Sequence, residues 1–179
     1  MDNKNLIQLF QASFRDNWDL PALSQFGRGD VLTYGELARR IAQAHLLFKL
    51  CGVSRGDKIA VMGKNTVSWV CAYMASLTYG AVVVPVLAEF HPEDAMHIIN
   101  HSGSVMLFVS QSVWEHMTFH RMPGLKAAFS LDTRELLGEH PKNRQRCEKA
   151  IKALPLTFLK VFPEGFKAEN VKYPLIDKE

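Results

Sequence analysis

The sequence predicts an α/β domain built on a doubly wound parallel sheet with helices on both faces, and three observations support this. Short, almost wholly apolar runs at 58–62, 82–86 and 105–109 have the length of buried strands, and 127–131 is expected to form a fourth. The segments between the first three runs show the apolar spacing of helices. Strand and helix therefore alternate, which is the order of βαβ units with right-handed crossovers.

The N-terminal residues predict two small elements before this sheet. Residues 5–14 form a short amphipathic helix, with its apolar side chains on one side. Residues 22–26 and 31–32 are expected to pair as a small hairpin around 27–30, where two glycines tolerate positive φ.

The next helix has the clearest boundaries. Thr33 and Glu36 fit a capping box, in which the threonine hydroxyl accepts from the amide of Glu36 and the glutamate reaches back to the cap amide. Gly52 suits the left-handed position that ends a helix. The apolar face of this helix comprises Leu37, Ile41, Ala44, Phe48 and Cys51.

Three further helices follow the first buried strand. Asn65 is the expected cap of a helix that runs to Tyr79. The buried face of this helix is predicted to comprise Val70, Tyr73, Met74 and Leu77. Pro92 suits the first turn of the following helix, and Ser110 is expected to cap a short helix through Met117.

The C-terminal part of the chain has weaker periodicity. A basic helix is predicted over 141–153, and 154–179 is expected to be loop and linker with one strand near 157–161. We therefore divide the chain into an α/β sub-domain, residues 1–132, and a helix with linker, residues 133–179.

Composition excludes several classes of protein. Hydrophobic residues make up 47% and charged residues 22% of 179 residues, which is the balance of a globular domain. The net charge of +3 is too small to indicate a nucleic-acid partner. The solvated face of a helix explains the one basic cluster most simply, and a phosphate or membrane role is the alternative. This cluster comprises Lys142, Arg144, Arg146, Lys149 and Lys152.

The cysteines and the apolar runs indicate a cytoplasmic protein. Cys51, Cys71 and Cys147 are isolated in the sequence, as expected for reduced, buried thiols. The first residues are polar and are not followed by the apolar core of a signal peptide. The longest apolar run, 81–88, is far shorter than the ~20 residues that span a bilayer.

No residue is assigned a catalytic, cofactor-binding or metal-binding role from spacing alone. Residues 63–66 place a lysine and a hydroxyl at a helix start, where an anion could bind, although an ordinary strand-to-helix turn is the simpler explanation. His97 and His101, and likewise His116 and His120, are four apart and could supply two metal ligands each. No third ligand is evident, so surface or partly buried histidines are the simpler interpretation.

Three stretches resemble motifs of the adenylate-forming superfamily, which includes acyl-CoA synthetases, luciferases and peptide-synthetase adenylation domains. Residues 32–37 (Leu-Thr-Tyr-Gly-Glu-Leu) resemble its first motif, and 77–86, with Gly-Ala before a strand that contains proline, resemble its second. Residues 52–60 are similar to the passage between them. Trp114 and residues 122–126 resemble the bacterial long-chain fatty acid–CoA ligases in particular.

The resemblance implies an N-terminal fragment of an enzyme that forms an acyl-adenylate from a fatty acid and ATP, with Mg²⁺, and then acyl-CoA from coenzyme A. The family's phosphate loop would begin shortly after residue 179, so the fragment is expected to be inactive alone and to need the remaining part of its chain. Self-association through exposed apolar surface is also expected. The alternative is a free-standing α/β binding or assembly module without catalysis.

Overall fold

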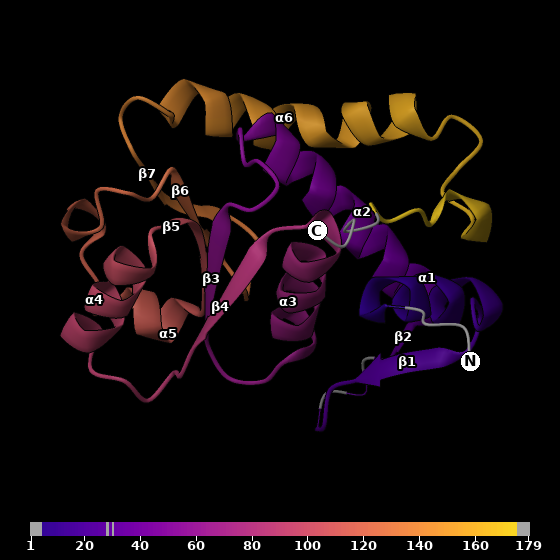
Figure 1. The fold of residues 1–179 in the computed structure, drawn as a ribbon, viewed down its shortest axis with the longest axis horizontal. Helices are drawn as coiled ribbons and strands as arrows, with labels where there is room; N and C mark the ends of the chain where they lie inside the picture. The colour runs from indigo at the N-terminus through magenta and orange to yellow at the C-terminus, as the bar shows by residue number, and fades with distance from the viewer. Residues whose placement is uncertain (1–4, 28, 30, 175–179) are drawn as a thin grey trace.

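A five-stranded sheet forms the centre of the molecule in this computed structural model, which describes residues 5–27, 29 and 31–174 (Figure 1). The strand order is β4-β3-β5-β6-β7. The strands are β3 (Lys58–Met62), β4 (Val82–Val86), β5 (Ser104–Val109), β6 (Ala127–Ser130) and β7 (Leu136–Glu139). The first four are parallel and β7 is antiparallel to β6, so the predicted parallel sheet is a mixed one.

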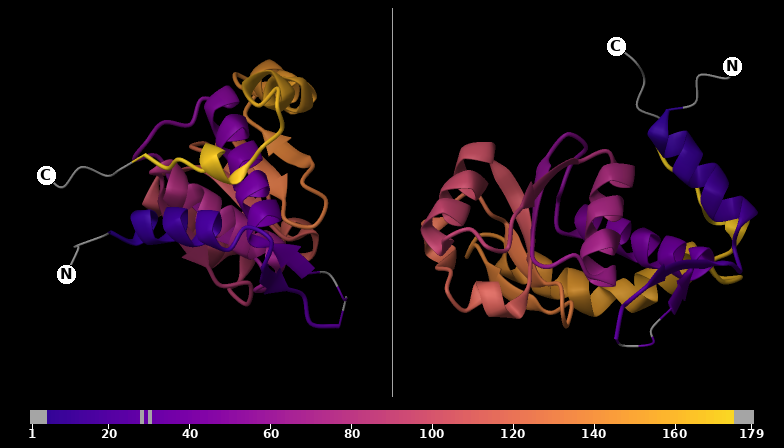
Figure 2. Two further views of the ribbon diagram at one scale, coloured as in Figure 1. Left: turned by 90° about the vertical axis from the view of Figure 1, so that its right-hand side faces the viewer. Right: turned by 90° about the horizontal axis from the view of Figure 1, so that it is seen from below.

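Helices cover both faces of the sheet, as predicted (Figures 1 and 2). The α-helices are α1 (Leu6–Asp16), α2 (Tyr34–Leu50), α3 (Val67–Tyr79), α4 (Pro92–Ser102), α5 (Gln111–Trp114) and α6 (Arg144–Val161). Ile59 packs in a core with α1, α2, α3 and α6, whereas its neighbour Ala60 packs in a second core with α4. This alternation of faces is the period-2 pattern of a strand with both sides covered.

The remaining elements are small. The predicted hairpin is present as β1 (Pro21–Ser24) and β2 (Val31–Thr33), which pair antiparallel. Arg28 and Asp30 of its turn lie outside the described residues. Two short 3₁₀ helices, η1 (Phe119–Arg121) and η2 (Ala168–Asn170), complete the structure. No described helix has the length and apolar character needed to cross a bilayer.

The capping box predicted for α2 is confirmed. The amide of Glu36 donates to Thr33 Oγ1 at 3.2 Å, and the amide of Thr33 donates to Glu36 Oε2 at 2.8 Å. Gly52 follows the helix with a φ of 76°, in the left-handed region that glycine adopts without steric cost.

Replacing Thr33 with alanine is expected to lower the free energy of unfolding by about 1 kcal/mol, because the amide of Glu36 loses its acceptor. Urea denaturation followed by circular dichroism measures this change. Thr33→Ser is the matched control and is expected to keep most of the stability, since its hydroxyl accepts the same bond. Equal stability of the alanine variant and the parent would contradict the proposed role of the cap.

The start and the buried face of α3 differ from the prediction. Thr66, not Asn65, is the cap, and its Oγ1 accepts from the amide of Trp69 at 3.2 Å. The fully buried positions of α3 hold small residues: Ala72, Ala75, Ser76 and Thr78. The hydroxyls of Ser76 and Thr78 donate to carbonyls one turn earlier, at 2.8 and 2.6 Å, which allows these polar side chains to be buried. The larger residues predicted to be buried are only partly so: Val70, Tyr73, Met74 and Leu77.

The strand β4 is not the buried strand that its sequence predicts, because it lies at an edge of the sheet. Val86 is buried, but Val82 is 49% exposed and Pro85 is also exposed. An edge suits Pro85, since proline has no amide to offer a further strand.

The C-terminal prediction is wrong in two respects. α6 begins at Arg144 and continues through Pro155 to Val161, so the strand expected near 157–161 is helical. Cys147, Ala150 and Phe158 are buried along one side of α6, and this helical packing outweighs the amide bond lost at the proline. The strand β7 was not predicted. The boundary between sub-domains at residue 132 stays a prediction.

Candidate functional site

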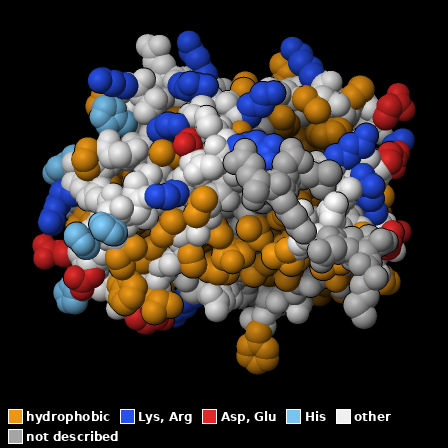
Figure 3. Space-filling model, viewed as in Figure 1, with side chains coloured by type: hydrophobic (Ala, Val, Ile, Leu, Met, Phe, Trp, Pro, Cys, Tyr) orange, Lys and Arg blue, Asp and Glu red, His pale blue; other side chains and the backbone are white. Residues whose placement is uncertain are grey.

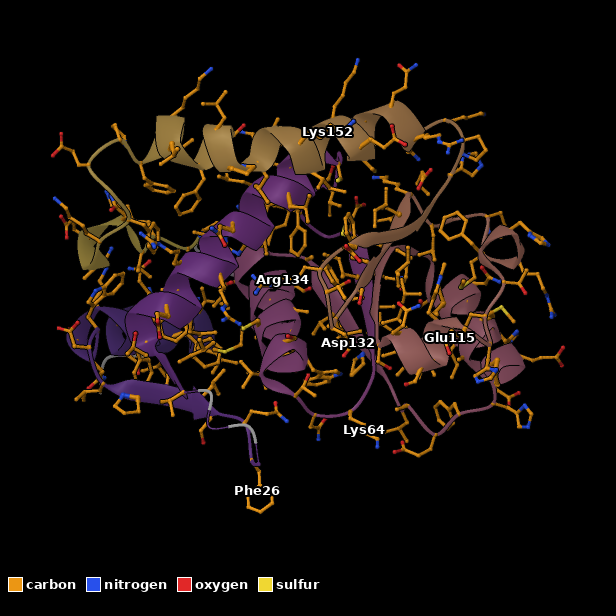
Figure 4. The ribbon with its side chains drawn as sticks, turned by 180° about the vertical axis from the view of Figure 1, so that it is seen from behind. Phe26, Lys64, Glu115, Asp132, Arg134 and Lys152 are labelled. Atoms are coloured by element: carbon orange, nitrogen blue, oxygen red, sulfur yellow. The ribbon has the colours of Figure 1, made fainter. Side chains whose placement is uncertain are left out.

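The carboxyl ends of the parallel strands meet at one edge of the sheet, which is where α/β proteins commonly bind ligands. β3 and β5 are neighbours, yet the chain leaves β3 towards α3 on one face and leaves β5 towards α5 on the other. This reversal is a topological switch point. Gly63 follows β3, Ser110 follows β5, and Asp132 lies just beyond β6. Figure 4 shows Asp132 at this edge, with Lys64 on the loop between β3 and α3.

The switch point itself is closely packed. The amide of Ser110 donates to the carbonyl of Met62 at 3.1 Å, and that of Leu131 donates to Val109 at 2.9 Å. A Cβ placed on Gly63 would lie 2.9 Å from Leu131 Cδ1 and 3.4 Å from Ser110 Cβ. A side chain at position 63 would displace the Leu131 side chain, so glycine suits this close approach.

A hydrogen-bonded turn follows β6 beside the switch point. Asp132 Oδ2 accepts from the amide of Gln111 at 2.7 Å and so joins the end of β6 to the start of α5. Ser130 Oγ accepts from the amides of Asp132 and Thr133 at 3.1 and 3.0 Å. Arg134 then adopts a left-handed φ of 64°, which is unusual for a residue with a side chain. No motif in the sequence predicts this turn.

The anion site considered at 63–66 has few free donors. The amide of Val67 donates to Gln25 Oε1 at 3.1 Å, and the amide of Trp69 donates to Thr66 Oγ1 at 3.2 Å. Two amides at the start of α3 are therefore already satisfied by side chains. This geometry favours the ordinary strand-to-helix turn.

The histidine pairs do not converge on a metal. The rings of His97 and His101 stack on α4 with centroids 5.9 Å apart. His116 and His120 do not share a helix, because α5 ends at Trp114 rather than at Met117 as predicted. Within the described part of the chain, no group of three or more histidine, cysteine or acidic residues could hold a metal ion.

A cavity of about 160 Å³ lies next to the carboxyl edge, between α2, α3, the sheet and α6. Arg40 and Arg134 both line it, and Figure 4 shows Arg134 lying near α2 and α3. Burial raises the pKa of the Cys71 thiol, while Arg40 opposes that rise, so Cys71 is not an activated nucleophile. The apolar part of the wall comprises Ala44, Leu47, Ala72, Phe108, Phe129, Leu131, Ile151 and Leu154.

A second cavity, of about 350 Å³, lies between α2 and the segment 162–174. His45 lines it, and its Nε2 lies 3.0 Å from both the carbonyl of Ala75 and Oγ1 of Thr78. Burial lowers the pKa of His45 to about 4, so the ring is neutral at physiological pH. Tyr173 also lines this cavity, and its buried hydroxyl has no partner among the described residues.

These groups do not fit a Mg²⁺-nucleotide. A triphosphate held for attack requires several converging donors, and Mg²⁺ requires oxygen ligands in octahedral geometry. At the carboxyl edge, the Asp132 carboxylate is already bonded to Gln111, and Lys64 is exposed on its loop. We therefore derive no catalytic step from the described residues.

Comparison with known proteins identifies relatives of this chain. Residues 10–171 match the family described as AMP-binding enzyme. The crotonobetaine/carnitine–CoA ligase of Proteus mirabilis is 35% identical over 86 residues, which are 48% of this chain and 17% of that protein. The long-chain-fatty-acid–CoA ligase of Salmonella typhimurium is 29% identical over 107 residues, 59% of this chain and 19% of that protein.

Solved structures share the fold at lower identity. An anthranilate CoA ligase in complex with anthranoyl-AMP superimposes with a TM-score of 0.65 at 17% identity, over 71% of this chain and 25% of that one. A long-chain-fatty-acid–CoA ligase from Archaeoglobus fulgidus superimposes with a TM-score of 0.63 at 16% identity, over 81% of this chain and 30% of that one. The chain thus spans less than a fifth of these two curated relatives and less than a third of these solved ones.

Proposed function

Because the chain belongs to the AMP-binding enzyme family, we propose that it is the N-terminal part of an ATP-dependent fatty acid–CoA ligase. In that reaction the fatty acid carboxylate attacks the α-phosphorus of ATP and pyrophosphate leaves, with Mg²⁺ as cofactor. The thiolate of coenzyme A then attacks the acyl carbon and AMP leaves. The observation that carries the proposal is the family match over 10–171, in a chain that spans only part of its relatives.

The described residues supply scaffold to this enzyme. Of the motifs that suggested the family, residues 32–37 form the capping box that starts α2. Residues 77–86 form the end of α3, the left-handed Gly80 and the edge strand β4. Both motifs stabilise helices and strands, and neither offers a side chain that would take part in the reaction. We therefore assign the phosphate-binding residues to another part of the enzyme.

The choice of fatty acid rests on resemblance. Trp114 packs against Phe119 with ring centroids 6.1 Å apart, and Met122 is fully buried, so both act in packing within this chain. The long-chain-fatty-acid–CoA ligase among the relatives supports the proposal. Other relatives are named for crotonobetaine or 3-hydroxybenzoate, so acyl-chain length is the part that substrate assays must decide. We propose the cytoplasm as the enzyme's location.

A pyrophosphate-release assay tests the assignment of the chemistry. The 179-residue chain, given ATP, Mg²⁺, coenzyme A and fatty acids of several lengths, is expected to release no pyrophosphate above the protein-free rate. A full-length long-chain-fatty-acid–CoA ligase serves as the positive control. Turnover by the isolated chain would contradict the proposal.

The surface that would meet the rest of the enzyme lies on α3 and β4. We define the α3–β4 face as Val70, Tyr73, Met74, Leu77 and Val82, and Figure 3 shows hydrophobic side chains gathered across this front of the molecule. α3 has no charged residue, and its large apolar side chains lie on its partly exposed side, which is typical of a helix that further protein covers. β4 also has an edge without a paired strand among the described residues.

In the isolated chain this face is expected to cause self-association. Replacing Val70 and Met74 with glutamine should lower the self-association constant about ten-fold, because both side chains are polar afterwards and helix propensity is kept. Analytical ultracentrifugation of the parent and the variant measures this. A parent that stays monomeric at high concentration would show that the face does not associate.

A further inference from the structure

The outer side of α6 interleaves exposed leucines with lysines. We define the α6 outer face as Lys149, Lys152, Leu156, Leu159 and Lys160, all of which are exposed. Leu156 is 58% exposed and Leu159 is 63% exposed. At 3.6 residues per turn these five positions share the side opposite to the buried Cys147, Ala150 and Phe158. These two leucines, one turn apart, interrupt the wholly solvated face that the sequence predicts most simply.

This face is open along its whole length. α6 has 18 residues and is about 27 Å long. It lies across α2 and forms the upper edge of the molecule in Figure 1 and in the left-hand view of Figure 2. Figure 4 shows Lys152 on this edge, remote from Lys64 on the loop after β3. A flat or gently curved surface could therefore contact the entire α6 outer face at once.

The charge of α6 is positive towards solvent. Glu148 is its acidic residue, and Arg144 pairs with it at 3.5 Å while also pairing with Glu139 at 3.2 Å. The three lysines of the outer face have no ion pair among the described residues. Glu164 lies beyond the C-terminal end of the helix and is exposed.

The interleaved pattern distinguishes a membrane surface from a protein partner. The cores of protein interfaces are depleted of lysine, and the α3–β4 face, which contains no charged residue, has that character. Helices that bind lipid interfaces combine lysines with large apolar side chains that enter the headgroup region. In α6 both kinds of side chain lie on the side that faces away from the core. Lysine stems extend along apolar surface while their ammonium groups reach lipid phosphates.

We propose that the α6 outer face binds the surface of an anionic lipid bilayer. Leu156 and Leu159 enter the boundary between headgroups and acyl chains, and the three lysines contact anionic headgroups on either side. The helix lies in the plane of the interface and does not span the membrane. This proposal does not depend on the catalytic assignment, because it concerns a surface of the isolated chain.

Vesicle flotation tests the proposal, since aggregated protein sinks whereas lipid-bound protein rises. The 179-residue chain is expected to float with phosphatidylglycerol–phosphatidylcholine vesicles and to bind pure phosphatidylcholine at least about ten-fold more weakly. Each lysine is expected to contribute about five-fold to binding, so K149Q/K152Q/K160Q should weaken binding to the anionic vesicles about 100-fold in total. L156Q/L159Q should weaken it about ten-fold.

The helix α1 offers a matched control. L6Q/L9Q replaces two leucines with the same spacing and similar exposure, 53% and 51%, on a helix without lysine, and should leave binding unchanged. Circular dichroism verifies that each variant is folded. Failure of the parent to float with anionic vesicles would overturn the proposal, as would equal loss in L6Q/L9Q. It would also be overturned if L156Q/L159Q changed the sedimentation coefficient without lipid but left flotation intact, because α6 would then be a protein interface.

Discussion

Replacing Phe48 with alanine is expected to lower the free energy of unfolding by about 4 kcal/mol. Phe48 has no exposed surface and lies where α2 meets both α3 and the sheet. Its ring contacts Tyr79 edge-on, with centroids 5.3 Å apart, and Phe108 at 5.8 Å. Truncation removes these contacts and leaves a cavity that helices on both sides cannot easily close. A loss of this size is a large part of the 5–15 kcal/mol that typically stabilises a domain.

Phe26 provides the control for Phe48, because it is the same residue type and is fully exposed. Phe26→Ala is expected to change stability by less than about 0.5 kcal/mol. Urea denaturation of the parent and both variants, monitored by circular dichroism, gives the comparison. A Phe48→Ala loss below about 1 kcal/mol would mean that the packing around α2 differs from the structure described.

Acidification from pH 7.5 to 5 is expected to cost about 2 kcal/mol of stability through His45 alone. Burial lowers the pKa of His45 in the folded state to about 4, from 6.5 when exposed. Between these values the unfolded chain binds a proton that the folded chain does not, so stability falls as the pH falls. Some of the His45 side chain remains exposed towards the larger cavity, where water screens part of the effect.

His45→Gln isolates this contribution from that of the carboxylates. The side-chain amide of glutamine can donate to the carbonyl of Ala75 and to the hydroxyl of Thr78, which His45 Nε2 contacts in the parent. Unlike histidine, glutamine does not titrate. Urea midpoints measured from pH 5 to 7.5 should therefore fall less steeply towards acid for the variant than for the parent. Parallel pH profiles would contradict the proposal that a buried, neutral His45 destabilises the fold in acid.

Features of the fold that depend on residues close together in the sequence could be predicted from short motifs and spacing. The capping box of Thr33 and Glu36 lies within one turn of α2, so its spacing alone identifies it. Of the face predicted for α2, Leu37, Ile41 and Phe48 are buried, whereas Ala44 is only partly buried. The face of α3 could not be predicted in this way. Its large and its small apolar residues both have helical spacing, and only the close approach to α2 and the sheet selects the small ones.

The C-terminal errors have a similar cause. Pro155 predicts the end of a helix, but burial of Phe158 against the first core keeps α6 helical beyond it. β7 is short and partly buried throughout, and it exists because β6 offers an edge for pairing. Such pairing depends on tertiary contacts that no short stretch of sequence encodes.

The candidate site could be predicted only in part. A sequence with βαβ units predicts that Gly63 and Ser110 share a sheet edge, because both follow parallel strands. The hydrogen bond from the Gln111 amide to Asp132 joins residues that are 21 apart in the sequence, and no sequence motif predicts it. Ser110, directly after β5, and Asp132, two residues after the end of β6, were the available signal.

The central claim is that this chain forms part of the enzyme's scaffold but lacks the residues that bind the triphosphate. Isothermal titration with Mg-ATP tests it most directly. A full-length ligase of the family should give stoichiometric heat under the same conditions. The 179-residue chain is expected to give only heat of dilution. Saturable binding of one ATP per chain would contradict that claim.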